Sequence, residues 1–344
     1  MNIDFDRFSF HPKKNFLDIS LILKNFTKII IQSKIEDNFE ISDISSLNNQ
    51  RKNSILFLND KNPNDILTDN ILIITDNERL FKNNKFNNII LTNSLNTFYN
   101  DIINFFISHD DSINYKDEFD FINGSHISKF SNIKKDVFIG NNCVIGRGVT
   151  IGSKSIIKNN VVIKNSILGT NVIISDNTSI GTSGFGFDYK VRGAINLNPQ
   201  IGIVYIDNNT HIGSSCTIDR AKIDITYIGK NCMIDNLIHI AHNVFLDDNI
   251  CIAAQTGISG STIIGKNVTI GGQVGIAGHI KIGNNVVIAA KSGVTKNIKE
   301  NSTIAGFPAI DIKEWKKRLI MEKKNGYKWN SKNTSSPISF LVDW

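Results

Sequence analysis

The sequence has little proline and cysteine, and it lacks a long apolar run. Its 344 residues include only 5 Pro and 4 Cys. The cysteines form no C-x-x-C pair, so we expect buried, reduced thiols and neither disulfides nor a zinc site at Cys143, Cys216, Cys232 and Cys251. No apolar run approaches the ~18 residues of a membrane-spanning helix, and acids stand at the N-terminus where a signal peptide has basic and then apolar residues. We therefore expect a cytoplasmic protein without a transmembrane segment.

The excess of positive charge is modest and does not by itself indicate a nucleic-acid partner. The net charge is +6, and lysine supplies most of it. A composition rich in Lys and Asn and poor in Pro is also typical of an AT-rich genome, so we expect no nucleic acid among the partners. Hydrophobic residues make up 41% and charged residues 20%, which is typical of a folded globular protein and excludes a disordered chain.

A bulky aliphatic residue returns at every sixth position between Tyr227 and Ile298. This period is neither the 3.6 of a helix nor the alternation of a strand. It predicts a chain that coils in short straight segments, each of which sends one aliphatic side chain inward. One rung cannot bury its apolar side alone, but stacked rungs share a continuous core, so the pattern predicts a β solenoid. The predicted inward residues are Ile228, Ile234, Ile240, Leu246, Ile252, Ile258, Ile264, Ile270, Ile276, Ile282, Ile288 and Val294.

The same period occurs earlier in the chain, with two interruptions. It begins at Ile127, and after a one-residue deletion behind Ile163 it continues to Ile180. Residues 182–200 then break it with a Gly-Phe-Gly-Phe run and a polar segment, and the period also slips around Ile223. We expect 182–200 to form an extruded loop, and long loops of this kind are often functional.

Residues 1–123 contain no such period and are expected to form a small α/β domain. A helix is predicted over 97–107, and strands are predicted for the apolar runs Ser54–Leu58, Ile71–Ile74 and Asn88–Leu91. The solenoid domain is then predicted to cover 124–305. A helical extension over 306–344 follows, in which Asp311 to Lys324 reads as a basic amphipathic helix.

Three residues are predicted to share one edge of the solenoid. Equivalent positions of successive coils stack about 4.8 Å apart. His242 follows inward Ile240 by two places, which puts it at a corner, and Gly260 comes eighteen residues later. His279 is expected near the same edge, roughly 10 Å away. An imidazole base, a bare N–H that can bind an oxyanion, and a second imidazole that can contact substrate are typical of acyl transfer.

Other interpretations of the histidines remain open at this point. A surface histidine on a solenoid is ordinary, and the sequence indicates no role for His211 or His239. His239, His242 and His279 loosely resemble the zinc histidines of β-helical carbonic anhydrases. However, His239 lies on the flat of a strand and the other two at corners, so we expect no metal site.

Four segments make the sequence similar to the UDP-3-O-acylglucosamine N-acyltransferases, a family of hexapeptide-repeat acyltransferases in lipid A biosynthesis. They are CTIDR (216–220), IDNLIHIAHN (234–243), AAQTGISGS (253–261) and GGQVGIAGH (271–279). The resemblance covers the whole chain. It implies a left-handed parallel β-helix with three segments per coil, an N-terminal α/β domain that binds the uridine nucleotide, and a C-terminal helical extension.

The resemblance also implies a reaction and partners. The family moves a 3-hydroxyacyl group from the phosphopantetheine thioester of acyl carrier protein to the 2-amino group of UDP-3-O-(3-hydroxyacyl)-glucosamine. It works as a homotrimer and has no bound cofactor. By this similarity His242 is the general base, for which an ordinary imidazole pKa of about 6.5 is suitable. The N–H of Gly260 binds the oxyanion, and His279 orients substrate or has a structural role only.

The same similarity assigns substrate contacts. Asp235 and Asn236 bind the sugar or polarise the histidine, and Asn243 is a further substrate-binding residue. In the uridine-binding domain Phe57 is expected to stack on uracil and Asn59 to replace a displaced amide. This region departs from the family pattern, because Asp60 and Pro63 stand where the family has Asn and Tyr.

Two expectations concern the C-terminal half. The cationic side chains Lys313, Lys316, Lys317 and Arg318 offer a landing surface for the acidic carrier protein, although an ordinary solvated helix face has the same composition. Gly293 is small and lies near the end of the expected acyl groove, which would leave room for a long acyl chain.

Rival functions are separated by their substrates. The sister O-acyltransferase that acts on UDP-N-acetylglucosamine resembles the solenoid but lacks a domain equivalent to 1–123. A coenzyme-A-dependent sugar N-acetyltransferase would use a different thioester. A non-catalytic β-helical scaffold would transfer no acyl group at all.

Overall fold

The computed structural model describes most of the chain, which divides into two compact units. The described residues are 17–36, 38–47, 49–58, 70–82, 86–106, 118–186, 198–307 and 309–324. The first unit comprises the described parts of Met1–Lys116, Ser183–Gly202 and Ala221–Asp224, and the second those of Asp117–Thr182, Ile203–Arg220 and Ile225–Trp344. Each unit is described separately below.

The first unit is built on a five-stranded sheet in the order β2-β7-β6-β5-β4. The strands β4, β5, β6 and β7 are parallel, and β2 joins the edge of β7 antiparallel. Their bounds are β2 (Ile30–Ile35), β4 (Asp43–Ser45), β5 (Ser54–Phe57), β6 (Ile71–Thr75) and β7 (Asn88–Thr92). A separate two-stranded pair consists of β1 (Leu17–Asp18) and β3 (Glu40–Ile41), and the helices are α1 (Ile19–Asn25), α2 (Glu78–Phe81) and α3 (Leu95–Phe106). The predicted strands at 54–58, 71–74 and 88–91 are confirmed as β5, β6 and β7.

Helices cover this sheet because its central strands are apolar on both faces. Every residue of β6 and β7 is buried. Phe98 and Ile102 of α3 pack with Ile55 and Leu72 on one face, and Leu56 faces a second cluster on the other. Parallel strands with two buried faces are typical of α/β domains. The helix predicted over 97–107 begins earlier, at Leu95, because the hydroxyl of Ser94 caps the first turn by accepting the Thr97 N–H at 3.3 Å.

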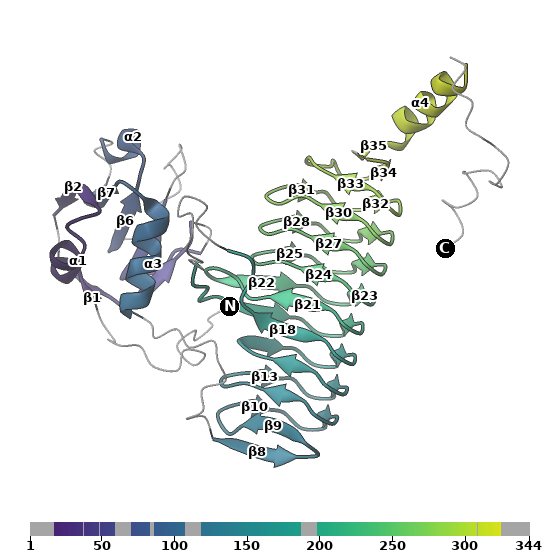
Figure 1. The fold of residues 1–344 in the computed structure, drawn as a ribbon, viewed down its shortest axis with the longest axis horizontal. Coiled ribbons are helices and arrows are strands. Elements are labelled where there is room, and N and C mark those ends of the chain that lie inside the picture. The colour runs from purple at the N-terminus through teal and green to yellow at the C-terminus, as the bar shows by residue number, and fades with distance from the viewer. Residues whose placement is uncertain are drawn as a thin grey trace, which may run out of the picture. The chain divides into compact units, whose positions relative to one another are not determined.

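The second unit is a solenoid of very short strands that form three sheets (Figure 1). One sheet contains β10 (Asn132–Ile133), β13 (Thr150–Ile151), β16 (Ser166–Leu168), β19 (Ile203–Ile206), β22 (Ile225–Ile228), β25 (Phe245–Leu246), β28 (Ile263–Ile264) and β31 (Lys281–Ile282). The second contains β11 (Phe138–Ile139), β14 (Ile156–Ile157), β17 (Ile173–Ile174), β20 (His211–Ile212), β23 (Met233–Ile234), β26 (Cys251–Ile252), β29 (Thr269–Ile270), β32 (Val287–Ile288), β34 (Thr303–Ala305) and β35 (Ile310–Asp311).

The third sheet carries the candidate site. It contains β8 (Phe119–Ile122), β9 (Ser125–Ser128), β12 (Val144–Ile145), β15 (Val162–Ile163), β18 (Ser179–Thr182), β21 (Thr217–Asp219), β24 (His239–Ile240), β27 (Gly257–Ile258), β30 (Gly275–Ile276) and β33 (Gly293–Val294). All neighbours in this sheet are parallel except the hairpin of β8 and β9. The described part of this sheet begins with β8, at Phe119.

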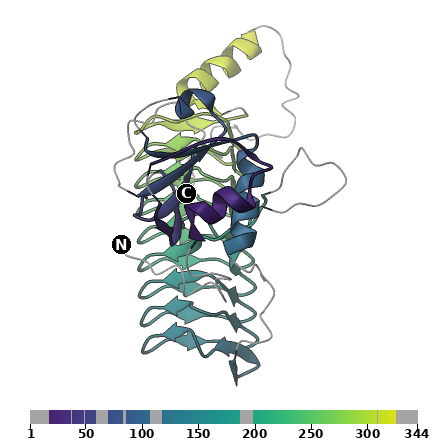
Figure 2. The ribbon, with the colours of Figure 1, turned by 90° about the vertical axis from the view of Figure 1, so that its left-hand side faces the viewer.

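The inward aliphatic residues stack into continuous columns, as the period of six predicted. In the third sheet Ile240 pairs with Ile258, and Ile258 pairs with Ile276 one coil further on. These three side chains are at most 2% exposed. Each fully buried side chain of this kind contributes about 1.5–3 kcal/mol, so the stack is stabilised along its whole length. The view in Figure 2 shows the coils stacked on one another in chain order.

Many corners between the sheets have a left-handed backbone, and asparagine is the commonest residue at these positions. Asn231, Asn249, Asn267 and Asn285 have φ between 56° and 61°, a region in which asparagine is tolerated better than most residues. Their side-chain amides also bond from coil to coil, with distances of 3.0–3.1 Å from Asn231 through Asn249 and Asn267 to Asn285. The asparagine-rich composition therefore has a structural use at these corners.

Two insertions interrupt the coils next to each other. Ser166 pairs with Val204, across the extruded loop, and Ile203 pairs with Ile225, across a second and much shorter insertion. The insertions are hydrogen-bonded together, since Gly202 N donates to Ala221 O at 3.0 Å. Both belong to the first unit. The extruded loop was predicted at 182–200, and its segment 187–197 lies outside the described residues.

The last coil ends in an antiparallel pair, β34 with β35, and α4 (Ile312–Lys324) follows directly. This confirms the predicted basic helix. Ile312, Trp315 and Leu319 are half-buried on one side of it. The predicted partition into domains ending at 123, 305 and 344 remains a prediction.

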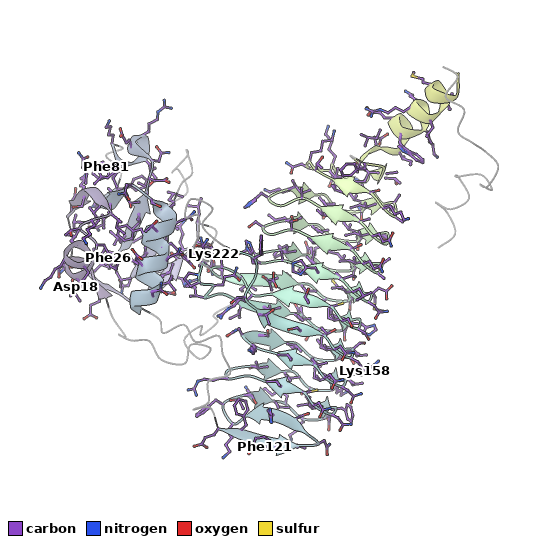
Figure 3. The ribbon with its side chains drawn as sticks, in the orientation of Figure 1. Asp18, Phe26, Phe81, Phe121, Lys158 and Lys222 are labelled. Carbon is purple, nitrogen blue, oxygen red and sulfur yellow. The ribbon has the colours of Figure 1, made fainter. Side chains whose placement is uncertain are left out.

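One expectation about the cysteines was wrong. Cys143, Cys216 and Cys232 are buried, but Cys251 is exposed, and all four are free thiols. The buried three lie at inner corner positions, whereas Cys251 directly precedes inward Ile252 and therefore points outward from β26. Figure 3 shows how side chains project from the outer surface of the coils, for example Lys158.

Candidate active site at a corner of the β-helix

His242 lies at the corner between β24 and β25. It follows Ile240 and Ala241, and its side chain is half-buried. The next residue, Asn243, has a φ of 59° and donates its backbone N–H to Thr226 Oγ1 at 2.9 Å. Asn243 Oδ1 lies 3.2 Å from His242 Nδ1. When Nδ1 carries the proton and donates it to this oxygen, Nε2 is left with a free lone pair, which is the state a general base needs.

Gly260 lies directly against the imidazole, one coil further along the same corner. The coils are joined there by Ser261 N, which donates to His242 O at 3.0 Å. A methyl group on Gly260 would place its carbon 2.8 Å from both Cε1 and Nε2 of His242. Only a residue without a side chain leaves room for the ring in this position.

The backbone N–H of Gly260 is uncapped because the residue above it is also a glycine. At several other corners, the side chain one coil above caps the equivalent N–H: Asp248 accepts from Lys230 N at 3.0 Å, and Asn284 accepts from Lys266 N at 2.8 Å. Above Gly260 lies Gly278, which has no side chain to do this. Within the part of the chain that the structure describes, the Gly260 N–H therefore has no acceptor and can bind an oxyanion.

His279 occupies the next column of the same corner. Its backbone has a φ of 60°, its side chain is exposed, and its N–H donates to Gly260 O at 3.1 Å. The structure thus brings His242, Gly260 and His279 together. The imidazole of His279 faces solvent at the open side of the corner, where a substrate can approach.

Asp235 and Asn236 lie at the preceding corner, and their hydrogen bonds go to backbone. Asp235 Oδ2 accepts from Ala254 N at 3.2 Å, and Asn236 Oδ1 accepts from Ser214 N at 2.7 Å. The charge of Asp235 acts on His211, whose pKa is lowered mainly by burial and raised in part by this carboxylate. These contacts hold neighbouring coils together, and the described structure records none between either side chain and His242.

A column of glycines runs along the flat face beside this corner. His239 pairs with Gly257, Gly257 with Gly275, and Gly275 with Gly293. A side chain at Gly257 or Gly275 would meet nothing within 4 Å, so this strip of the face is open. At Gly293 the expectation of free space was wrong, since a side chain there would overlap the ring of Phe307. The open strip therefore ends at Phe307.

The residues predicted to bind uridine lie in the first unit. Phe57, at the end of β5, contacts Tyr99 of α3 edge-on with ring centroids 5.2 Å apart. The Lys222 ammonium lies 4.1 Å from the centroid of the same Tyr99 ring, and burial lowers the pKa of this lysine. Asn59, Asp60 and Pro63 lie outside the described residues.

The cationic residues predicted to receive a carrier protein are exposed on α4. Lys313, Lys316, Lys317 and Arg318 are all exposed. As for a metal, the described residues contain no group of three or more His, Cys, Asp or Glu side chains that could hold one.

Comparison with known proteins identifies the repeat. Residues 130–165 and 261–296 match the family model described as bacterial transferase hexapeptide (six repeats). This chain carries bacterial transferase hexapeptide repeats. The second matched segment contains His279 and lies one residue after Gly260, so the hexapeptide repeats include part of the candidate site.

Curated relatives and a solved structure agree with this result. The hexapeptide-repeat chain is 48% identical over 147 residues to the UDP-3-O-acylglucosamine N-acyltransferase of Desulfotalea psychrophila, which covers 43% of each protein. It is 57% identical over 139 residues to the enzyme of that name from Geobacter sp. (strain M21), which covers 40% of each. The matched segments therefore span less than half the length of these relatives.

The crystal structure of UDP-N-acetylglucosamine O-acyltransferase from Moraxella catarrhalis has the same solenoid. It superposes with a TM-score of 0.50 at 26% identity, over 61% of the hexapeptide-repeat chain and 85% of that protein. The predicted fold class, a left-handed parallel β-helix of hexapeptide repeats, is confirmed. Among the described helices of the chain, none has the length and apolar character needed to cross a membrane.

Sequence reasoning missed two features of this corner. It assigned Asn243 to substrate and did not predict the contact of this side chain with the imidazole of His242. It also assigned no role to Asp219, which lies close to His239. The signal for Asp219 was available, because a carboxylate directly after an inward isoleucine is an unusual choice at a position that is buried between coils.

Proposed function

We propose that this chain is an N-acyltransferase that moves a 3-hydroxyacyl group from the phosphopantetheine thioester of acyl carrier protein to the 2-amino group of UDP-3-O-(3-hydroxyacyl)-glucosamine. The observation that carries the proposal is the contact of the His242 imidazole with Gly260, whose N–H is left uncapped. The name of the relatives, UDP-3-O-acylglucosamine N-acyltransferase, supports the choice of acceptor. A homotrimer in the cytoplasm, without a bound cofactor, is part of the same proposal.

The geometry accounts for each step of acyl transfer. His242 Nε2 accepts a proton from the attacking amine as the nitrogen bonds to the thioester carbon. The carbonyl oxygen becomes an oxyanion and accepts a hydrogen bond from the Gly260 N–H. When the carbonyl re-forms, the carbon–sulfur bond breaks, and the thiolate takes the proton from His242. The products are an amide and the free thiol of the carrier protein.

Neighbouring side chains hold the reacting groups. Asn243 fixes the ring of His242 through its 3.2 Å contact with Nδ1. His279 orients the substrate from the exposed side of the corner. Asp235 and Asn236 bind the substrate from the preceding corner. In the first unit, Phe57 stacks on uracil and Asn59 adds a polar contact.

The test is the product formed by the purified full-length protein. It is incubated with UDP-3-O-acylglucosamine and 3-hydroxyacyl carrier protein, and the product is analysed by mass spectrometry. We expect the mass of one added 3-hydroxyacyl group, resistant to mild base as an amide is. An ester on UDP-N-acetylglucosamine would instead support the O-acyltransferase activity named for the structural neighbour. Transfer from coenzyme A alone, or no product, would reject the proposal.

The open glycine strip is proposed to hold the acyl chain, with Phe307 at its end. Phe307→Ala removes the ring that lies against Gly293, so longer acyl chains are expected to fit. Because excluding one methylene changes kcat/KM by roughly 10- to 200-fold, the preference should move clearly toward longer carrier thioesters. Rates with a series of chain lengths measure it.

Gly293→Met is the matched control for this prediction. Its side chain competes with Phe307 for the same space, so it should preserve or shorten the preferred chain length. An unchanged preference in Phe307→Ala would show that the strip does not determine acyl length.

The cationic face of α4 is proposed to bind the acidic carrier protein. Changing Lys313, Lys316, Lys317 and Arg318 together to Glu is expected to raise KM for the acyl carrier thioester by about tenfold or more at low salt and to leave kcat nearly unchanged. The difference from the unchanged protein should shrink as salt increases, because exposed charges are screened. KM for the UDP-sugar is the internal control. A KM for the carrier thioester that does not change at low salt would contradict the assignment.

A further inference from the structure

A buried carboxylate lies on the coil below the proposed base. Asp219 is the last residue of β21, and its side chain is only 8% exposed. The ladder between β21 and β24 pairs Thr217 with His239 and Ile218 with Ile240. When this register is continued by one residue, Asp219 lies beneath Ala241, which directly precedes His242.

The carboxylate is held against a second histidine. His239 Nε2 lies 3.6 Å from Asp219 Oδ2, and His239 Nδ1 lies 2.8 Å from Thr217 Oγ1. When both ring nitrogens carry protons, Nδ1 donates to the hydroxyl and Nε2 faces the carboxylate. Asp219 and Thr217 therefore fix the ring of His239 at the start of the open glycine strip.

Asp219 interacts electrostatically with the imidazoles of both His239 and His242. Burial raises the pKa of Asp219, and the two histidines His239 and His242 lower it in part. The other strand that pairs with β21 is β18, which contributes the uncharged Ser179, Ile180 and Thr182. The next residue along the chain, after the end of β21, is the buried Arg220. A carboxylate whose ionisation is favoured by two imidazoles favours, in return, the protonated form of both.

We propose that Asp219 is a positioning residue whose buried carboxylate orients His239 and stabilises the positive charge that His242 acquires when it takes a proton. The proposal rests on the acyl transfer proposed above. In that reaction the proton of the amine resides on His242 between attack on the thioester and departure of the thiolate. Asp219 does not touch substrate, because it is buried, and it acts only through the two imidazoles.

The test is Asp219→Asn, which keeps the shape of the side chain and removes its charge. We expect the titration midpoint of the His242 imidazole to move down by about one pH unit, as for the loss of a nearby opposite charge. The measurement is NMR of protein labelled with ¹⁵N-histidine, in which His239→Gln and His242→Gln assign the signals. The acidic limb of the pH–rate profile should move in the same direction, and kcat should fall about tenfold, the factor that one unit represents.

Stability separates this role from a structural one. The pKa of Asp219 is raised in the folded protein above the value of 3.8 that a free carboxyl has. The folded state therefore binds the proton more tightly, and this group reduces stability as pH rises through its folded pKa. Asn does not ionise, so Asp219→Asn should melt at neutral pH no lower than the unchanged protein. A residue that only supports the fold would lower Tm when changed.

Asp207→Asn is the matched control. Asp207 also follows an inward isoleucine and is buried, but it lies on another sheet, where Tyr227 donates to it at 3.2 Å. We expect Asp207→Asn to leave the titration of His242 unchanged. An unchanged titration midpoint in Asp219→Asn, or an equal shift in both variants, overturns the proposal. The NMR measurement does not depend on turnover. If the protein without substitutions transferred no acyl group, that result would reject the proposed function and not the role of Asp219.

Discussion

His242→Ala is expected to reduce kcat for acyl transfer by about 10²- to 10⁴-fold, the range that a general base contributes. The side chain is the imidazole whose Nδ1 contacts Asn243 Oδ1 and whose Nε2 lies over Gly260. Without it, the amine proton loses the acceptor proposed for it as the amide bond forms. Steady-state rates with acyl carrier thioester and UDP-acylglucosamine measure the loss, and KM for both substrates should change little.

His211→Ala is a suitable control, because His211 is also a partly buried histidine on the β-helix. Its Nε2 lies 3.2 Å from Ser175 Oγ, on a different sheet from β24. We expect its kcat to stay close to that of the unchanged protein. If His242→Ala retained full activity while folded, a general-base role for His242 would be excluded.

Gly260→Ala is expected to lower kcat by about 10²- to 10³-fold, which is comparable with the loss of one oxyanion donor, because the methyl group obstructs the N–H that it leaves in place. The added methyl group would lie 2.8 Å from Cε1 and Nε2 of His242 and must displace the ring. It also stands beside the N–H that the oxyanion uses. One small substitution therefore disturbs both the base and the donor, while the inward Ile258 that stabilises the coil stays in place.

Gly272→Ala is the matched control for this variant. Gly272 follows inward Ile270 by two places, as Gly260 follows Ile258, but it lies at another corner. A methyl group there would come no closer than 3.2 Å to Ala254 O. We expect Tm to change little in either variant and only Gly260→Ala to lose activity. Equal rates in the two variants would show that acyl transfer does not need the free space at Gly260.

Much of the site followed from counting residues. A parallel β-helix converts sequence spacing into vertical stacking, so the spacing of His242 and Gly260 predicted their contact. The identity of the two residues then predicted a base beside a bare amide. What spacing could not predict is the missing cap on the Gly260 N–H, because that depends on which side chains bond across coils at the other corners.

Side chains that come from different segments were harder to predict. Phe307 fills the space beside Gly293, although the two residues belong to different elements of the last coil. From the spacing of residues in the sequence alone, the space beside Gly293 was predicted to be free. Asp219 reaches His239 only because a four-residue insertion, Ala221–Asp224, lies between the two strands and preserves their register. Which side chains meet in this way depends on the position of the insertion in the coil. The repeat pattern does not indicate that position.

The period of six by itself determined the solenoid, its inward columns and the corner on which His242 lies, because a rung can bury its apolar side only by stacking on the next one. The α/β character of the first unit and the basic α4 also followed from local patterns. Only the tertiary structure decided where the open strip ends, which amide remains uncapped and which carboxylate is buried beside the histidines. Those features arise from side chains that meet across coils, where packing and hydrogen bonding depend on neighbours distant in the chain.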